Sequence, residues 1–111
     1  MTTLQILKAA RELISEPERW TKDAEARSPI GRSVRHESPN ACRWCVLAAI
    51  WRAGGPPPPS GYGTGAIGAL LDAGGFGDSI SLLDYNDDPN TTHADILALY
   101  DRAIALEEAR P

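Results

Sequence analysis

A run of four prolines in the middle of the chain, Pro56–Pro59, constrains the fold more than any other feature. Proline fixes φ at about −65° and has no backbone N–H, so such a run cannot lie inside a helix or a central strand. It predicts a stiff polyproline spacer, and the neighbouring glycines extend this Gly/Pro-rich region over residues 54–63. Other prolines and glycine pairs also interrupt the chain, so we expect short elements on both sides.

Apolar residues spaced three and four apart predict helices between these interruptions. The predicted helices cover residues 2–16, 20–27, 41–53 and about 64–73, and a last helix begins after Thr92. Residues 28–39 read as a polar loop, and residues 79–85 fit neither a helical nor a strand period.

Helix caps support three of these helices. Thr2 or Thr3 can cap the first helix, and Asn40 can cap the third. Thr92 with Asp95 three residues later matches a capping box. Gly74 and Gly75 are expected to end the fourth helix.

These elements predict an all-α fold, a single compact domain of four to five helices over residues 1–111. A chain of 111 residues with 42% hydrophobic residues can bury a core without a disulfide or a metal. The sequence has no apolar stretch long enough for a membrane span and no secretory signal, so we expect a cytoplasmic protein with reduced thiols.

The net charge of −4 conceals an uneven distribution. Residues 19–52 contain seven Arg or Lys against three acidic residues, whereas residues 53–111 contain two against nine. All three tryptophans lie in the basic segment. Such asymmetry indicates either a face that binds anions or two halves that attract each other within the fold.

Arginines near aromatic residues suggest a site for an anionic, nucleotide-like molecule, because guanidinium groups bind phosphates and aromatic rings stack on bases. The candidate phosphate-binding residues are Arg27, Arg32, Arg35 and Arg43, and the candidate stacking residues are Trp44 and Tyr62. Asn86 and Asp87 in the polar loop before the last helix are added as ligand-binding candidates, although a local Asx turn would also explain them.

The pair Cys42 and Cys45 raises three further possibilities. A redox motif would need a βαβ context that this chain lacks. A zinc site could use His36, Cys42, Cys45 and His93, and a cysteine nucleophile could use His93 with Asn86 or Asp87. We instead expect both cysteines on the apolar face of one helix, where burial raises a thiol pKa. We therefore predict no catalytic residue, no metal and no cofactor.

Residues 63–68 match the pattern GxGxxG and precede a predicted helix. The preceding segment is the proline run and not a strand, which makes a dinucleotide-binding fold improbable.

Two segments carry a resemblance to a known family. They are Arg43-Trp44-Cys45-Val46-Leu47-Ala48-Ala49 and Tyr85-Asn86-Asp87 followed by Thr92 and Asp95-Ile96. They resemble a family of short proteins of unknown function found chiefly in actinobacteria and their phages. The family pattern has Trp-Cys followed by Gly-Ala, and Trp-Asn-Asp followed by Arg-Thr. Here Ala48 replaces the glycine, Tyr85 the tryptophan and Thr91 the arginine. The resemblance implies only Cys45 as a shared cysteine and no histidine at His93, and it implies no reaction.

The sequence thus favours a small non-enzymatic binding protein, phage-encoded and acting against a host pathway by binding an anionic nucleotide-like molecule. One alternative is a protein–protein adaptor or inhibitor that binds a host protein through the acidic face and the proline spacer. A cysteine-dependent enzyme is a further alternative. The acidic second half disfavours duplex nucleic acid, no membrane partner is expected, and the oligomeric state stays open.

Overall fold

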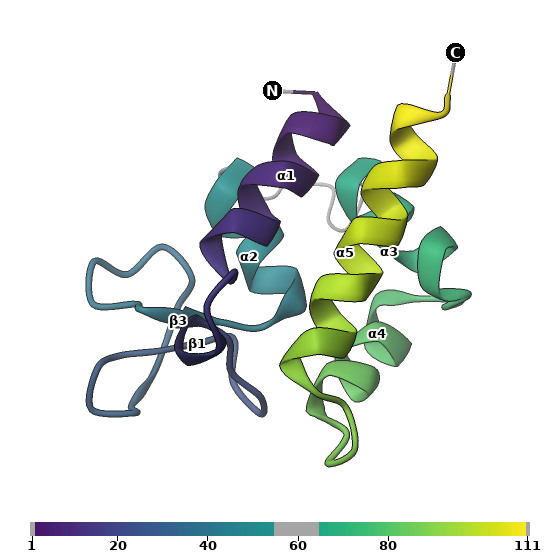
Figure 1. Cartoon of the computed structure of the whole chain (residues 1–111). Helices are drawn as coiled ribbons and strands as arrows, with labels where there is room; N and C mark the ends of the chain where they lie inside the picture. The colour runs from purple at the N-terminus through teal and green to yellow at the C-terminus, as the bar shows by residue number, and fades with distance from the viewer. Residues whose placement is uncertain (1, 55–64, 111) are drawn as a thin grey trace.

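A computed structural model describes residues 2–54 and 65–110 of the chain (Figure 1). The helices among these residues are α1 (Thr3–Leu13), the 3-10 helix η1 (Pro17–Arg19), α2 (Val46–Gly54), α3 (Gly65–Gly74), α4 (Ser79–Asp87) and α5 (His93–Glu108). The strands are β1 (Ala26–Arg27), β2 (Ser33–Val34) and β3 (Arg43–Trp44).

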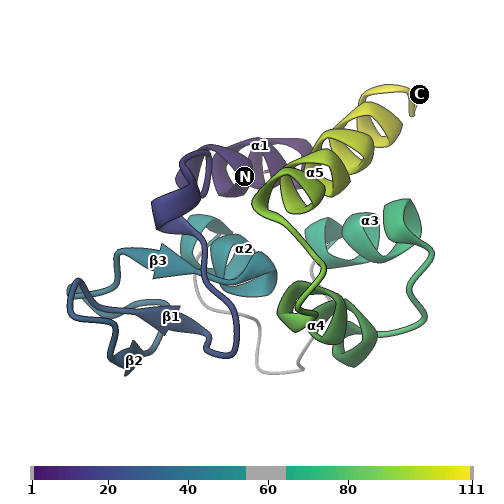
Figure 2. The ribbon, with the colours of Figure 1, turned by 60° about the horizontal axis from the view of Figure 1, so that its bottom comes forward.

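The helices pack in two layers around one core. Helices α1 and α5 lie side by side over α2, α3 and α4, with the strands at the α2 end of the molecule (Figure 2). Helices α1, α2, α3 and α5 turn their apolar residues inward, as the spacing of those residues predicts, and α4 contributes the buried side chains of Leu82 and Asn86. The largest fully buried side chains come from all five α-helices and include Tyr100, Leu7, Ile50, Leu70 and Leu82. The core therefore lies between the two helical layers.

The three strands form a small antiparallel sheet in the order β2-β1-β3. The register pairs Ala26 with Val34 and with Trp44, and the sheet turns Ala26 and Trp44 into the core. The fold is therefore mostly helical but not all-α, and the predicted helix over residues 20–27 is wrong. Each strand is two residues long, which is too short to show an alternating pattern in the sequence.

The predicted helix over residues 41–53 also starts too early. Helix α2 begins at Val46, and Asn40 lies outside it, so Asn40 is not its N-cap. Cys42 precedes β3 and is half-buried, whereas Cys45 lies between β3 and α2 and is buried. The two cysteines therefore do not share a helix face, because pairing of residues 43 and 44 with β1 keeps this segment extended.

The other predicted helices are confirmed with shifted ends. Thr2 caps α1 and Thr92 caps α5, each in a full capping box. Helix α3 ends at Gly74, followed by Gly75 with φ +71°. Residues 79–85, left without a prediction, belong to α4, whose N-cap is Asp78. The predicted spacer lies outside the described residues except for Gly54, and so do the first two positions of the GxGxxG pattern.

Within the described ranges, no single helix is long and apolar enough to cross a membrane. Helices α3 and α4 reach the required length and composition only as a pair, and they are bent by 64° relative to each other.

Candidate functional site

Two predicted arginines lie opposite each other on the outer face of the sheet. The register pairs Arg27 on β1 with Arg43 on β3 and with Ser33 on β2. Their neighbours Ala26 and Trp44 are buried on the other face. Successive residues of a strand point to opposite faces, so Arg27 and Arg43 share the solvent face. We call Arg27, Arg32 and Arg43 the arginine face; Arg32 lies in the turn between β1 and β2.

Arg27 is held in place by its neighbours. Its Nε donates to the Thr21 hydroxyl at 2.9 Å, and its Nη1 donates to the Gly31 carbonyl at 2.9 Å. Its Nη2 donates to the Lys22 carbonyl at 3.3 Å. The guanidinium groups of Arg32 and Arg43 have no hydrogen-bond or ion-pair partner in the part of the chain that the structure describes. The arginine face therefore combines one guanidinium that hydrogen bonds hold in place, that of Arg27, with two that have no partner among the described residues, those of Arg32 and Arg43.

Two other predicted residues do not join this face as expected. Arg35 pairs with Glu37, with 2.8 Å between Nε and Oε1. Trp44 is 6% exposed, its indole N–H donates to the His36 carbonyl at 3.2 Å, and the Arg52 guanidinium covers its ring at 5.7 Å. The ring of Trp44 is thus not available for stacking on a base. Tyr62 lies outside the described residues.

Asn86 serves the fold instead of a ligand surface. It is fully buried, and its side-chain oxygen accepts from the Trp20 indole N–H at 2.8 Å and from the Val46 backbone N–H at 3.1 Å. Its amide nitrogen donates to the Thr21 carbonyl at 3.1 Å and to Asp87 Oδ1 at 3.0 Å. An amide side chain offers two donors and two acceptor positions, so none is left over.

Asp87 lines a hollow of about 270 Å³ between the sheet and α4. The other lining residues are Ala24, Glu25, Cys45, Trp51 and Leu83. The buried indole N–H of Trp51 has no hydrogen-bond partner among the residues described. Burial, with smaller contributions from the nearby charges of Asp87 and Glu25, raises the pKa of the Cys45 thiol to about 11. At neutral pH this wall of the hollow therefore carries a protonated thiol and not a nucleophilic thiolate.

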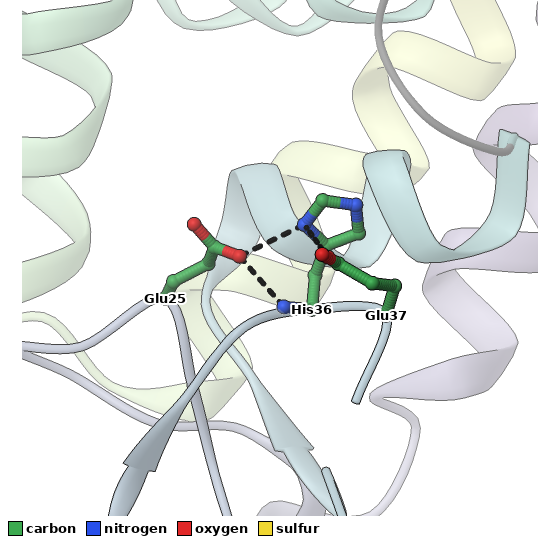
Figure 3. A group of neighbouring side chains, drawn as sticks. All are labelled: Glu25, His36 and Glu37. Carbon is green, nitrogen blue, oxygen red and sulfur yellow. Dashed lines mark hydrogen bonds and ion pairs between the residues drawn. The ribbon is translucent and has the colours of Figure 1, made fainter. Parts of the chain in front are cut away.

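Next to this hollow, two carboxylates meet one imidazole (Figure 3). His36 Nδ1 lies 2.8 Å from Glu25 Oε2 and 3.1 Å from Glu37 Oε2. Glu25 Oε2 also accepts the backbone N–H of His36 at 2.6 Å. The His36 side chain is 8% exposed, and its ring packs on Trp51 at 5.6 Å between centroids. Glu25 precedes β1 and His36 follows β2, so the hairpin brings them together.

The two cysteine-based alternatives are not assembled. Nε2 of His93 bonds the Ile14 carbonyl at 2.6 Å, and the His93 ring lies 6.0 Å from that of Trp20. In residues 2–54 and 65–110, the one group of three or more His, Cys, Asp or Glu side chains that could share an ion is Glu25, His36 and Glu37. The predicted set of His36, Cys42, Cys45 and His93 does not converge.

Sequence reasoning missed Glu25 and Glu37 as site residues, and it paired His36 with the wrong partners. The adjacent His36 and Glu37 gave one signal, since a histidine beside a carboxylate is a common ligand pair. Glu25 could be added only with the β1–β2 hairpin in hand, because its side chain reaches His36 across that hairpin.

The chain was also compared with known proteins. One family model, that of a family of unknown function, matches residues 1–106. No curated protein and no solved structure matches the chain.

Proposed function

The chain belongs to this family, DUF6197, and we propose that it is a small non-enzymatic binding protein whose arginine face holds an anionic, phosphate-bearing ligand. The observation that carries the proposal is the direct cross-strand pairing of Arg27 with Arg43. Like charges directly opposite each other on neighbouring strands destabilise a sheet. A bound anion would reduce the repulsion between Arg27 and Arg43. The ligand-free fold carries this repulsion in full, so it favours anion binding at the arginine face.

The hydrogen bonds of Arg27 favour binding further. They fix its side chain before a ligand arrives, which reduces the conformational entropy lost on binding. The guanidinium donors of Arg43 and Arg32 have no partner among residues 2–54 and 65–110. Guanidinium groups present donors in a planar fork that matches phosphate oxygens, so a phosphate group is the preferred ligand chemistry.

The proposal narrows the ligand expected from the sequence. Trp44 is buried, so recognition of a base by that ring is dropped, and Arg35 contributes only if it leaves Glu37. That exposed ion pair is weak enough to exchange, since such pairs are worth at most about 1 kcal/mol. The proposal still includes a nucleotide-like ligand, because its phosphate groups would bind the arginine face. A phage origin and a role against a host pathway rest on the resemblance alone.

The test is a thermal-shift and calorimetric panel of inorganic phosphate, pyrophosphate, a nucleoside diphosphate and a cyclic dinucleotide. We expect at least one anion to raise Tm with its degree of saturation, and to bind more weakly as salt rises. Arg43→Gln and Arg32→Gln should each weaken binding about tenfold, because each removes a charged hydrogen-bond donor. Arg110→Gln, which removes the same charge at the end of α5, is the matched control.

Two results would overturn the proposal. One is a panel in which no anion changes Tm. The other is an equal loss of affinity in Arg110→Gln and Arg43→Gln, which would indicate attraction by net charge and no defined site.

One observation favours the adaptor alternative. Ile30, in the turn between β1 and β2, is 83% exposed beside the arginine face. Hydrogen bonds of 2.9 Å from Ser28 N–H to the Arg32 carbonyl and from Gly31 N–H to the Ser28 carbonyl hold this turn. A protein partner that binds this apolar tip would lose affinity with Ile30→Ser, whereas binding of inorganic phosphate would be unchanged. That pair of measurements separates the two functions.

A further inference from the structure

We propose that Glu25, His36 and Glu37 form a binding site for a divalent transition-metal cation. This inference is independent of the anion proposal, because none of these three residues belongs to the arginine face.

The spacing of the three ligand atoms fits one coordination shell. Ligands bound at about 2.0–2.2 Å with angles between about 90° and 109° lie roughly 2.8–3.6 Å apart. The distances from His36 Nδ1 to the carboxylate oxygens of Glu25 and Glu37 are 2.8 and 3.1 Å. All three ligand atoms lie within 4.8 Å of one another. Two of the three separations therefore already fit one coordination shell, and an ion would bind once the two carboxylate oxygens also come within this range of each other.

A single hydrogen bond from Nδ1 of His36 cannot satisfy the carboxylates of both Glu25 and Glu37 with good geometry. Nδ1 of an imidazole carries at most one proton, yet two carboxylate oxygens approach it from two sides (Figure 3). The imidazole is also largely withdrawn from water, with 8% of the side chain exposed. An ion bound to Nδ1 would contact both oxygens at once, which a single proton cannot do with good geometry.

The charge around the cluster also calls for a cation. Neither Glu25 nor Asp87 forms an ion pair with a lysine or arginine in the described ranges, and both line the adjacent hollow. Two arginines contact the cluster: Arg52 Nη1 donates to the backbone carbonyl of His36 at 3.0 Å, and Arg35 holds Oε1 of Glu37 and leaves Oε2 directed at His36. Arg35 is thus a positioning residue for Glu37, comparable to the outer-shell partners of known metal ligands.

The donor set selects the class of ion. One imidazole nitrogen with two carboxylate oxygens suits Zn²⁺, Mn²⁺, Fe²⁺ or Co²⁺ better than Ca²⁺ or Mg²⁺, which prefer all-oxygen shells. Three protein ligands leave at least one position for water or another small ligand. The adjoining hollow of about 270 Å³ gives such a ligand room.

The experiment titrates the full chain, freed of metal with a chelator, with Zn²⁺ and Co²⁺ by calorimetry. We expect saturable binding of a single ion per chain, with Mg²⁺ binding much more weakly. Glu37→Gln and Glu25→Gln should each weaken Zn²⁺ binding about tenfold or more, since they remove a ligand charge but keep the side-chain shape and an acceptor oxygen. Glu18→Gln, an exposed glutamate on η1, is the control and should bind as the unchanged chain does.

Fluorescence supplies a readout of position. The ring of Trp51 packs on the His36 ring at 5.6 Å, so bound Co²⁺ should quench Trp51 emission while Zn²⁺ should not. Replacing Trp51 with phenylalanine should reduce the Co²⁺-dependent quenching, and the remainder should come from Trp44, whose indole N–H donates to the His36 carbonyl at 3.2 Å. The proposal is overturned if neither ion binds saturably, if Glu37→Gln and Glu18→Gln bind alike, or if quenching is undiminished in Trp51→Phe.

Discussion

The indole N–H of Trp20 donates to the side-chain oxygen of Asn86 at 2.8 Å and joins residues that are 66 positions apart. The same oxygen accepts the backbone N–H of Val46, the first residue of α2. Through these bonds and the one to the Thr21 carbonyl, a single amide links the segment after η1, the start of α2 and the end of α4. Asn86 therefore fixes the junction between the sheet and the helices.

Replacing Asn86 with leucine should destabilise the fold strongly. The change leaves the N–H groups of Trp20 and Val46 and the Thr21 carbonyl without their partner, at a position where Asn86 is fully buried. Each buried polar group left unsatisfied costs about 1–3 kcal/mol, and partial relaxation reduces the sum. We expect the free energy of unfolding in urea to fall by about 2–4 kcal/mol.

Asn90→Ala is the control for this substitution, because Asn90 is exposed and, within the described part of the chain, its side chain forms no hydrogen bond while its backbone N–H donates to Asp88. Its effect should stay within about 0.5 kcal/mol. A cost below about 1 kcal/mol for Asn86→Leu would show that water or rearrangement replaces the amide.

The sequence predicts the helices because their signals are local. Apolar residues three and four apart mark α1 and α5, and the capping boxes at Thr2 and Thr92 mark their starts. Capping depends on residues within one turn, so no tertiary information is needed. Helix α4 was not predicted because its apolar residues follow no helical stripe, although Asp78 caps it.

The sheet could not be predicted because its partners are distant in sequence. Strands of two residues show no period, and β1 gains its structure only by pairing with β2 and β3. The start of α2 at Val46 could not be predicted for the same reason, because the Val46 backbone N–H donates to the Asn86 side chain, 40 positions away. Local sequence signals favour Asn40 as the N-cap of this helix instead.

The same contrast between local and distant signals explains which candidate-site residues the sequence predicts. The arginines were identified by composition, and the strand register then places Arg27 opposite Arg43. The same register turns Trp44 inward, which composition cannot show. Glu25 was missed because a helix over residues 20–27 would not place it beside His36.

The cap of α5 gives a second test of stability. Thr92 accepts the Asp95 N–H at 3.1 Å, and the Asp95 carboxylate accepts the Thr92 N–H at 2.9 Å. Thr92→Ala should lower the free energy of unfolding by about 1 kcal/mol. Thr92→Ser keeps the hydroxyl and should lose less, and equal losses in the two variants would assign the effect to packing.

Two glycines in α3 should respond in opposite ways to alanine. A Cβ at Gly68 meets no atom of the described residues within 4 Å, so Gly68→Ala should stabilise the helix by about 0.5–1 kcal/mol. A Cβ at Gly74 would clash with the Phe76 ring, whose packing on Tyr85 at 5.3 Å restricts its movement. Gly74→Ala should therefore destabilise by about 1–3 kcal/mol. Thermal unfolding of both variants measures the contrast, and a Gly74→Ala variant as stable as the unchanged chain would contradict the expected clash.

The Cys45 thiol should make stability fall at alkaline pH. Burial raises its pKa from 9.0 to about 11, so between these values the folded chain holds a proton that the unfolded chain releases. Stability therefore decreases as pH rises through this window, since the state with fewer bound protons is favoured. Two pKa units correspond to roughly 2–3 kcal/mol, of which about 2 kcal/mol should be lost by pH 11.

Comparison with Cys45→Ala isolates this contribution from other alkaline titrations, above all that of buried Tyr100, whose pKa burial also raises. The difference in free energy of unfolding between the two chains should shrink or reverse between pH 8 and pH 11. Alkylation at neutral pH should modify half-buried Cys42 first and reach Cys45 only on unfolding. Rapid native alkylation of Cys45 would show a reactive thiolate, and it would return the cysteine-dependent enzyme as the leading alternative.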